Sequence, residues 1–168
     1  MHTPIRKLFA LSLAMVFVLM AGSVDAANTR GAKAPEIAIT DGINGVTAKT
    51  KIGDYKGSVT LLVQWLPVCP HCRKFMPQVH ALHAKYSKKG LRILTITHGK
   101  KDYTRKYMNG KKWTFGVGFD WTGISAKRYG MKRMPGVYLI GKDGYLRSYR
   151  GSLEAAIVTE LGTKAKTP

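Results

Sequence analysis

Cysteine is scarce in this sequence, since its 168 residues contain only two, Cys69 and Cys72. A chain of this length can bury a core of its own, so we expect one domain without a disulfide framework. Neither cysteine lies near the amino end, which excludes a lipid anchor on a new amino-terminal cysteine. Long apolar runs are also scarce: no segment after residue 26 reaches the roughly 20 apolar residues of a membrane-spanning helix.

Acidic side chains are the third shortage. The chain has 9 Asp and Glu against 28 Lys and Arg, a formal net charge of +19 at pH 7. The basic residues are spread through the chain, so a well-solvated surface is the ordinary interpretation of this basic protein. An acidic protein partner, an anionic membrane surface and a polyanion are the alternatives. Nucleic acid is not expected as a partner, because the chain is predicted to be exported and lacks the recognition motifs.

The amino end has the three parts of a secretory signal peptide. Arg6 and Lys7 are basic, residues 8–20 are apolar, and residues 24–26 supply a small-residue cleavage site. The apolar run is short for a membrane span, so we expect cleavage after residue 26 and a periplasmic or otherwise extracytoplasmic protein. An uncleaved membrane anchor is the alternative. The predicted organisation is a signal peptide at 1–26, a flexible leader at 27–34, one domain at 35–162 and a disordered tail at 163–168.

The stretch 59–79 organises the chain. Residues 59–66 are apolar and rich in β-branched and aromatic side chains, which predicts a strand buried on both faces. After Cys69-Pro70-His71-Cys72, apolar residues recur at the spacing of a helix, at Phe75, Val79, Leu82 and Tyr86. Cys69 therefore lies at the amino end of a helix, where unpaired N–H groups and the helix dipole favour an anion. We predict that Cys69 ionises more readily than a free thiol and that Cys72 is shielded.

Two cysteines separated by two residues indicate thiol-disulfide exchange. A bridge across so short a loop restricts the unfolded chain little, so a redox role fits better than a structural one. A Cys69 thiolate attacks a substrate disulfide, and Cys72 then resolves the mixed disulfide, with no cofactor other than this redox-active pair. A zinc site with His80 and His83 is the rival. It fits poorly, because His80 lies roughly 12 Å along the helix from Cys72.

The rest of the chain alternates strand and helix signals. Residues 36–40 and 46–49 predict an amino-terminal hairpin around the turn at 41–45, and residues 137–140 and 145–149 predict a second hairpin. Further strands are expected at 91–97 and 113–119, and further helices at 101–108, 124–129 and 153–161. Because helices separate the early strands and a hairpin joins the late ones, an α/β fold with a mixed sheet is predicted.

Several short motifs together carry a family resemblance. They are Asp54-Tyr55-Lys56-Gly57, Trp65, Cys69-Pro70-His71-Cys72, Pro77, residues 120–129, Met134-Pro135-Gly136 and Lys142-Asp143-Gly144. From about residue 35 to 161 the chain resembles the thioredoxin-like superfamily, and within it the extracytoplasmic thiol-disulfide oxidoreductases of the TlpA and ResA type. Its Pro-His dipeptide is the one found in the CPHC motif of the DsbA type. The resemblance implies a thioredoxin-like fold with a central mixed sheet flanked by helices, the amino-terminal β-hairpin and an inserted strand-helix unit.

The resemblance also implies the roles of the site residues. Cys69 and Cys72 are the catalytic pair, with Pro70 and His71 between them, and His71 is expected to stabilise the Cys69 thiolate. Pro135 corresponds to the family's cis-proline, which packs against the disulfide and presents the backbone of Met134 to substrate. Trp65, which leads into the turn, joins them as a candidate for substrate binding. The expected partners are protein thiols and disulfides, acidic partners among them, and a membrane-bound or periplasmic redox donor or acceptor.

The chain departs from the family at its acidic positions. Val63 stands where thioredoxin has a buried Asp, and Lys100 stands where many TlpA and ResA relatives have a Glu. No acidic proton acceptor is carried over. His98 is a candidate base, although a satisfied histidine at the end of a strand is its ordinary interpretation. Lys132 and Arg133, just before the cis-proline, are expected to add positive potential near the thiolate.

A stabilised thiolate makes the reduced form more stable, so we predict a stronger oxidant than thioredoxin. For Trp65 and Trp121, a position in the wall or core is expected in preference to a role in binding. A peroxide-reducing redoxin is the second hypothesis, although Leu66 stands where its signature needs a hydroxyl residue. A non-catalytic basic binding module is the third.

Overall fold

The structure of this protein is a computed structural model that describes residues 31–148 and 150–162. The strands of its sheet are β1 (Asp41–Ile43), β2 (Val59–Gln64), β3 (Leu91–Thr97), β4 (Gly116–Phe119), β5 (Gly136–Ile140) and β6 (Leu146–Arg147). The α-helices are α1 (Pro70–Tyr86), α2 (Lys101–Gly110), α3 (Ile124–Arg128) and α4 (Leu153–Leu161). Short 3₁₀ turns cover Ile52–Tyr55 and Ser87–Lys89. The signal peptide of the sequence prediction lies outside the described residues, and so does the predicted tail.

The six strands form one mixed sheet in the order β1-β4-β3-β2-β5-β6. Strands β2, β3 and β4 are parallel to one another, whereas β5 is antiparallel to β2 and forms the predicted second hairpin with β6. The predicted insertion is present as α2 followed by β4, and β4 begins at Gly116, three residues later than expected. The carboxyl ends of the three parallel strands therefore meet at one edge of the sheet, where α1 begins.

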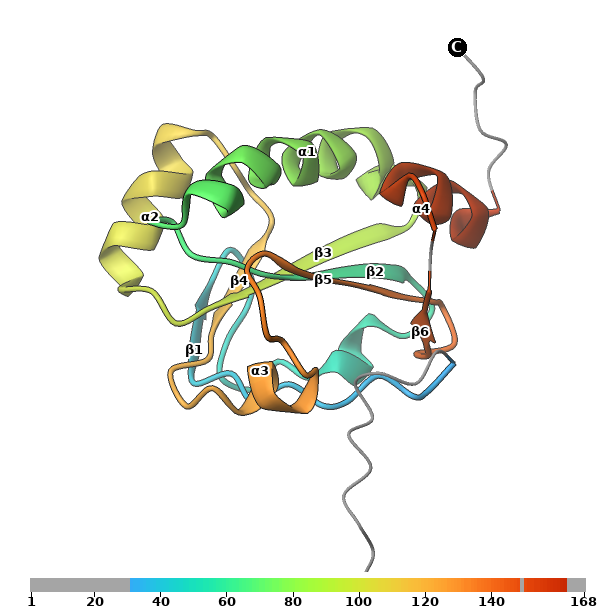
Figure 1. The fold of residues 1–168 in the computed structure, drawn as a ribbon, viewed down its shortest axis with the longest axis horizontal. Coiled ribbons are helices and arrows are strands. Elements are labelled where there is room, and N and C mark those ends of the chain that lie inside the picture. The colour runs from blue at the N-terminus through green and yellow to red at the C-terminus, as the bar shows by residue number, and fades with distance from the viewer. Residues whose placement is uncertain (1–30, 149, 163–168) are drawn as a thin grey trace, which may run out of the picture.

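Helices cover the two faces of the sheet unequally. Figure 1 shows α1, α2 and α4 on one face, and α3 on the other. Successive residues of β2 supply both cores, because side chains alternate along a strand: Val63 packs on the side of α1, and Leu62 packs on the side of α3. All six residues of β2 are buried, as predicted for a strand covered on both faces.

The predicted amino-terminal hairpin over residues 36–40 and 46–49 is wrong. The segment predicted as its turn contains β1, which pairs antiparallel with β4. Residues 36–40 instead run extended along the second face of the sheet, where Ile37 and Ile39 are buried against the same core as Leu62. Apolar residues alternate both in a paired strand and in an extended segment that packs on the face of a sheet. The pattern therefore predicts that Ile37 and Ile39 are buried, but not whether their segment pairs with a strand.

From residue 31 onward, the segment predicted as a flexible leader at 27–34 is hydrogen-bonded to the edge of the sheet. The backbone N–H of Gly31 donates to the carbonyl of Leu146 at 3.2 Å, and that of Ala34 donates to Gly144 at 2.9 Å. Ala34 is also buried in the second core. This segment therefore covers the β6 edge of the sheet, and residues 27–30 lie outside the described part. Within that part, no helix has the length and apolar character needed to cross a membrane.

Candidate active site

The turn between β2 and α1 positions both sulfurs. Cys69 has extended backbone angles (φ −76°, ψ 120°) and is the N-cap residue of α1, and Pro70 follows in the first turn, where its missing N–H costs nothing. The backbone N–H of Cys72 donates to the Cys69 sulfur at 3.4 Å. The N–H of Cys69 itself donates to the carbonyl of Leu66 at 3.1 Å, which closes the turn. The first sulfur thus occupies the place of the oxygen acceptor in an ordinary helix cap.

The same geometry separates the acidities of the two thiols. Hydrogen bonds from the Cys72 side chain, then from the backbone N–H groups of Cys72 and His71, lower the pKa of Cys69 below its usual value. Burial, followed by the hydrogen bond to Cys69, raises the pKa of Cys72 to about 11. Donors aimed at one sulfur favour its anion, whereas desolvation disfavours the other anion. The acidities of the two thiols are therefore asymmetric, and the more accessible sulfur is the one whose anion is favoured.

Exposure follows the same division. Cys69 is half-buried, while Pro70 and His71 are exposed, and Cys72 is completely buried in the core on the α1 side. Val68, directly before Cys69, is 62% exposed and offers an apolar surface beside the first sulfur. A macromolecule can therefore reach Cys69, but not Cys72, without a rearrangement.

The loop before β5 lies at the same edge of the sheet. The Met134–Pro135 peptide bond is cis. Gln64, the last residue of β2, pairs with Gly136 directly after this proline, so the β2–β5 register brings the loop beside the turn that follows β2. Met134 and Cys69 are both half-buried and pack against the same core. Lys132 and Arg133, the cations before Met134, are exposed.

The two tryptophans near the site differ in exposure. Trp65 is fully buried, with its ring centroid 6.0 Å from that of Tyr107 and 6.2 Å from that of Trp113. Substrate binding by Trp65 is therefore wrong, because the inserted α2–β4 unit covers it. Trp121 is 51% exposed and lines a cavity with Gln64 and His98, so it is a wall residue and not a core residue. Its indole N–H donates to the carbonyl of Gly99 at 3.3 Å, which holds the ring at the surface.

The sequence prediction missed Arg73, which braces the active-site turn. Its Nε donates to the Pro67 carbonyl at 2.6 Å, and one terminal nitrogen donates to the Tyr103 hydroxyl at 3.1 Å. The guanidinium also lies over the ring of Tyr107, 5.4 Å from the centroid. The side chain thus connects the turn that carries Cys69 to α2. A basic residue after a cysteine pair is one sequence signal for it, but its partners come from the tertiary structure.

The positions at which the sequence or the family resemblance suggested a base or a metal ligand are Val63, Lys100, His98 and the histidines of α1. Val63 is buried in the core, and Lys100 is the exposed N-cap of α2, so neither position supplies a proton acceptor. His98 is exposed and lines a cavity of about 340 Å³ with Gln64 and Trp121. Among residues 31–148 and 150–162, no three His, Cys, Asp or Glu side chains are grouped to hold a metal ion.

Comparison with known proteins gives this arrangement a family. A model described as the AhpC/TSA family matches residues 30–149. The chain belongs to the AhpC/TSA family. Among sequence relatives, thiol-disulfide oxidoreductase ResA of Bacillus cereus is 33% identical to this chain over 140 residues, which are 82% of this chain and 79% of that protein.

Solved structures similar to this AhpC/TSA family member have the same kinds of names as its sequence relatives. A protein described as thiol:disulfide interchange protein DsbE, from Chlorobium tepidum, is 30% identical and superposes with a TM-score of 0.65 over 79% of this chain and 95% of that chain. A thioredoxin-like superfamily protein is 25% identical, with a TM-score of 0.69 over 79% of this chain and 98% of that chain. The predicted thioredoxin-like fold and the predicted thiol-disulfide oxidoreductase activity are confirmed.

Proposed function

We propose that the nucleophile of this thiol-disulfide oxidoreductase is Cys69 and that Cys72 resolves the intermediate. The observation that carries this assignment is the hydrogen bond from the Cys72 N–H to the half-buried Cys69 sulfur at the amino end of α1. A donor in this position stabilises a thiolate without neutralising it. The charged sulfur is also the one that a protein substrate can reach.

The exchange proceeds in two balanced steps. The Cys69 thiolate attacks one sulfur of a substrate disulfide, an S–S bond forms between enzyme and substrate, and the second substrate sulfur leaves as a thiolate. Cys72 then loses its proton and attacks Cys69, which releases the reduced substrate and leaves the Cys69–Cys72 disulfide. In reverse, the disulfide accepts two electrons from a substrate dithiol. The raised pKa of Cys72, about 11, keeps it protonated until the first step has removed the charge on Cys69.

The neighbouring residues serve the pair in distinct ways. Pro70 fixes the first turn of α1, and the exposed His71 adds a hydrogen bond or positive charge near the thiolate. The backbone of Met134, held beside the turn by the β2–β5 register, pairs with the extended substrate. No cofactor other than the cysteine pair takes part in these steps.

The direction and the compartment belong to the same proposal. Every group that stabilises the Cys69 thiolate stabilises the reduced enzyme, so the pair is more oxidising than thioredoxin. The protein acts in the periplasm or another extracytoplasmic compartment, where disulfides persist. Its substrates are protein thiols and disulfides, and a periplasmic or membrane-bound redox protein restores its working state.

A trapping experiment tests the assignment. A Cys72→Ser variant retains the first step and lacks the second, so it accumulates a mixed disulfide with its substrate on residue 69. The matched Cys69→Ser variant keeps one thiol but loses the exposed nucleophile, and we expect no adduct from it. Mass spectrometry of non-reduced samples from the native compartment identifies the partner. Equal adduct formation by the two variants would contradict the assignment of roles, and the absence of adducts from both would contradict the proposed function.

A further inference from the structure

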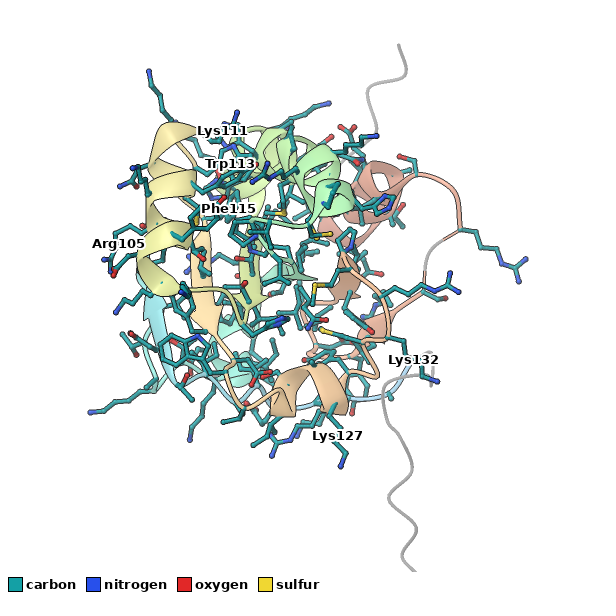
Figure 2. All side chains as sticks on the ribbon, turned by 60° about the vertical axis from the view of Figure 1, so that its left-hand side comes forward. Arg105, Lys111, Trp113, Phe115, Lys127 and Lys132 are labelled. Carbon is teal, nitrogen blue, oxygen red and sulfur yellow. The ribbon has the colours of Figure 1, made fainter. Side chains whose placement is uncertain are left out.

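A groove between α1 and α2 is not used by the chemistry described above. It contains a cavity of about 430 Å³ lined by Arg73, Pro77, His80, Tyr107, Lys111 and Trp113. We call it the α1–α2 groove. The first three residues lie on one stripe of α1, because they are separated by four and three positions. Figure 2 shows Lys111 and Trp113 at the end of this groove, where the chain leaves α2 toward β4.

The α1–α2 groove carries positive charge that its own lining does not neutralise. Arg73 and Lys111 line it, and no Asp or Glu does. The acid nearest in sequence on α2 is Asp102, and it already pairs with Arg105 at 3.4 Å. Neither Arg73 nor Lys111 forms an ion pair with any residue in the described part of the chain. An anion is therefore the charge that this groove favours.

Arg73 is held ready for such an anion. Its two hydrogen-bond partners, the Pro67 carbonyl and the Tyr103 hydroxyl, fix the guanidinium but are both neutral. The positive charge is thus oriented without being cancelled, and the guanidinium has further N–H groups beyond those two bonds. An oriented guanidinium binds a carboxylate better than a mobile one, because less rotamer freedom is lost on binding.

The wall of the groove is aromatic. The Trp113 ring stacks with Phe115 at 5.7 Å between centroids and lies edge-on to Tyr107 at 5.7 Å. The His80 ring is 6.3 Å from the Trp113 ring, and its buried Nδ1 has no hydrogen-bond partner among the described residues. The lining therefore combines two cations, a flat apolar surface and an unsatisfied polar atom.

We propose that the α1–α2 groove binds an acidic segment of the protein with which this enzyme exchanges a disulfide. A carboxylate pairs with Arg73 and Lys111, and an adjacent apolar or aromatic side chain packs on the half-buried Tyr107 ring, which the buried Trp113 supports from below. Protein as the partner rests on the proposed function. The location supports it, because Arg73 directly follows Cys72 and holds the Pro67 carbonyl of the active-site turn. A polypeptide joined to Cys69 thus lies next to the groove.

The test uses the full chain and a peptide that cannot take part in the chemistry. The probe is the cysteine-free peptide Glu-Phe-Glu-Leu-Glu, compared with its amide counterpart Gln-Phe-Gln-Leu-Gln, and binding is followed by tryptophan fluorescence. Lys111→Glu reverses a charge in the groove. Lys127→Glu makes the same change in net charge on α3, across the sheet from the groove (Figure 2), and it is the matched control.

We expect Lys111→Glu to weaken binding of the acidic peptide about tenfold or more. Lys127→Glu should weaken it less than about twofold, because charges beyond about 10 Å are screened at moderate salt. The amide peptide should bind wild type less tightly than the acidic one. Equal losses in the two variants, or equal binding of the two peptides, would overturn the proposal.

Two further measurements separate this proposal from its alternatives. Turnover of the uncharged disulfide bis(2-hydroxyethyl) disulfide in the same variants reports the redox chemistry without a carboxylate for the groove to bind, and Lys111→Glu should leave it unchanged. Selective peptide binding without turnover would contradict the proposed function and support the proposed role of the groove. Turnover without selective peptide binding would support the proposed function and contradict the role of the groove. Phosphatidylserine vesicles are the third probe. Vesicle binding that Lys111→Glu abolishes, with no binding of the acidic peptide, would assign the groove to a membrane surface and overturn the proposal.

Discussion

The backbone N–H of Cys72 points at the sulfur of Cys69, 3.4 Å away. The hydrogen bond from the Cys72 side chain, and then this backbone bond, lower the pKa of Cys69, whereas burial raises the pKa of Cys72. One short turn of chain thus provides a more acidic thiol near the surface and a less acidic thiol in the core. The asymmetry arises from the placement of the pair: the first cysteine caps α1, and the second lies inside its first turn. Without that placement, the same two residues would form an ordinary dithiol.

The side chain between the cysteines is expected to tune this asymmetry. Replacing His71 by Ala keeps the backbone N–H but removes the exposed imidazole that we propose stabilises the thiolate, so the Cys69 pKa should rise and the reduced form should lose stability. Thiol-disulfide exchange at neutral pH should slow by about threefold to tenfold, and the redox equilibrium with glutathione should shift toward a more reducing enzyme. Lys74→Ala removes another exposed cationic residue of α1 and is the control. Equal effects of the two substitutions would show that His71 acts only through net charge.

The β1 segment places a glycine where a side chain does not fit. A Cβ on Gly42 would meet the backbone carbonyl of Val46, which cannot move aside as a flexible side chain can. Gly42→Ala should therefore lower the free energy of unfolding by about 2 kcal/mol or more, measured by denaturant titration. Gly110, the last residue of α2, has open space at the same position. Gly110→Ala should raise stability by about 0.5 kcal/mol, and a loss there as large as at Gly42 would contradict this account.

The end of α1 is joined to α4 through one carboxylate. Glu154 accepts hydrogen bonds from Lys85 at 2.7 Å and from the Tyr86 hydroxyl at 2.6 Å, and these lower its pKa, the Lys85 bond most. The pair is partly exposed, so Glu154→Gln should cost only about 0.5–1 kcal/mol at neutral pH. Asp102→Asn, which removes a more exposed carboxylate paired at 3.4 Å, is the control and should cost less.

The pH dependence of that difference has a definite sign. A carboxyl with a lowered folded-state pKa contributes stability above its unfolded pKa and loses it as the pH falls through the folded value. The gap in unfolding free energy between wild type and Glu154→Gln should therefore be full at neutral pH and close on acidification below about pH 4. A gap that widens in acid would contradict the assignment of the hydrogen bonds.

Local pattern predicted the central part of this fold well. The strand over residues 59–64 and the helix that follows it could be predicted because β2 is buried on both faces and α1 repeats its apolar residues every three or four positions. Strand β3 and helix α4 have the predicted bounds for the same reason. The acidity of Cys69 followed from the helix end alone, since a backbone donor at that position needs no tertiary contact.

The features that the sequence did not predict are those that tertiary contacts determine. Trp65 is buried because the α2–β4 unit covers it, whereas Trp121 is exposed because it lies in the loop after β4. Sequence spacing does not reveal which tryptophan an insertion covers. The bracing role of Arg73 depends on the Pro67 carbonyl and on Tyr103, thirty positions away in the chain. Contacts of this kind are set by the packing of α2 on α1.

The central claim is that Cys69 is held as an accessible thiolate, and the pH dependence of its alkylation tests this most directly. The rate of modification of the reduced wild-type protein by iodoacetamide is measured across a range of pH, and mass spectrometry assigns the modified residue. We predict modification at Cys69 first, with a midpoint below the value of about 8.5 for an unperturbed thiol, while Cys72 stays unmodified. A midpoint at or above that value, or earlier modification of Cys72, would contradict the claim.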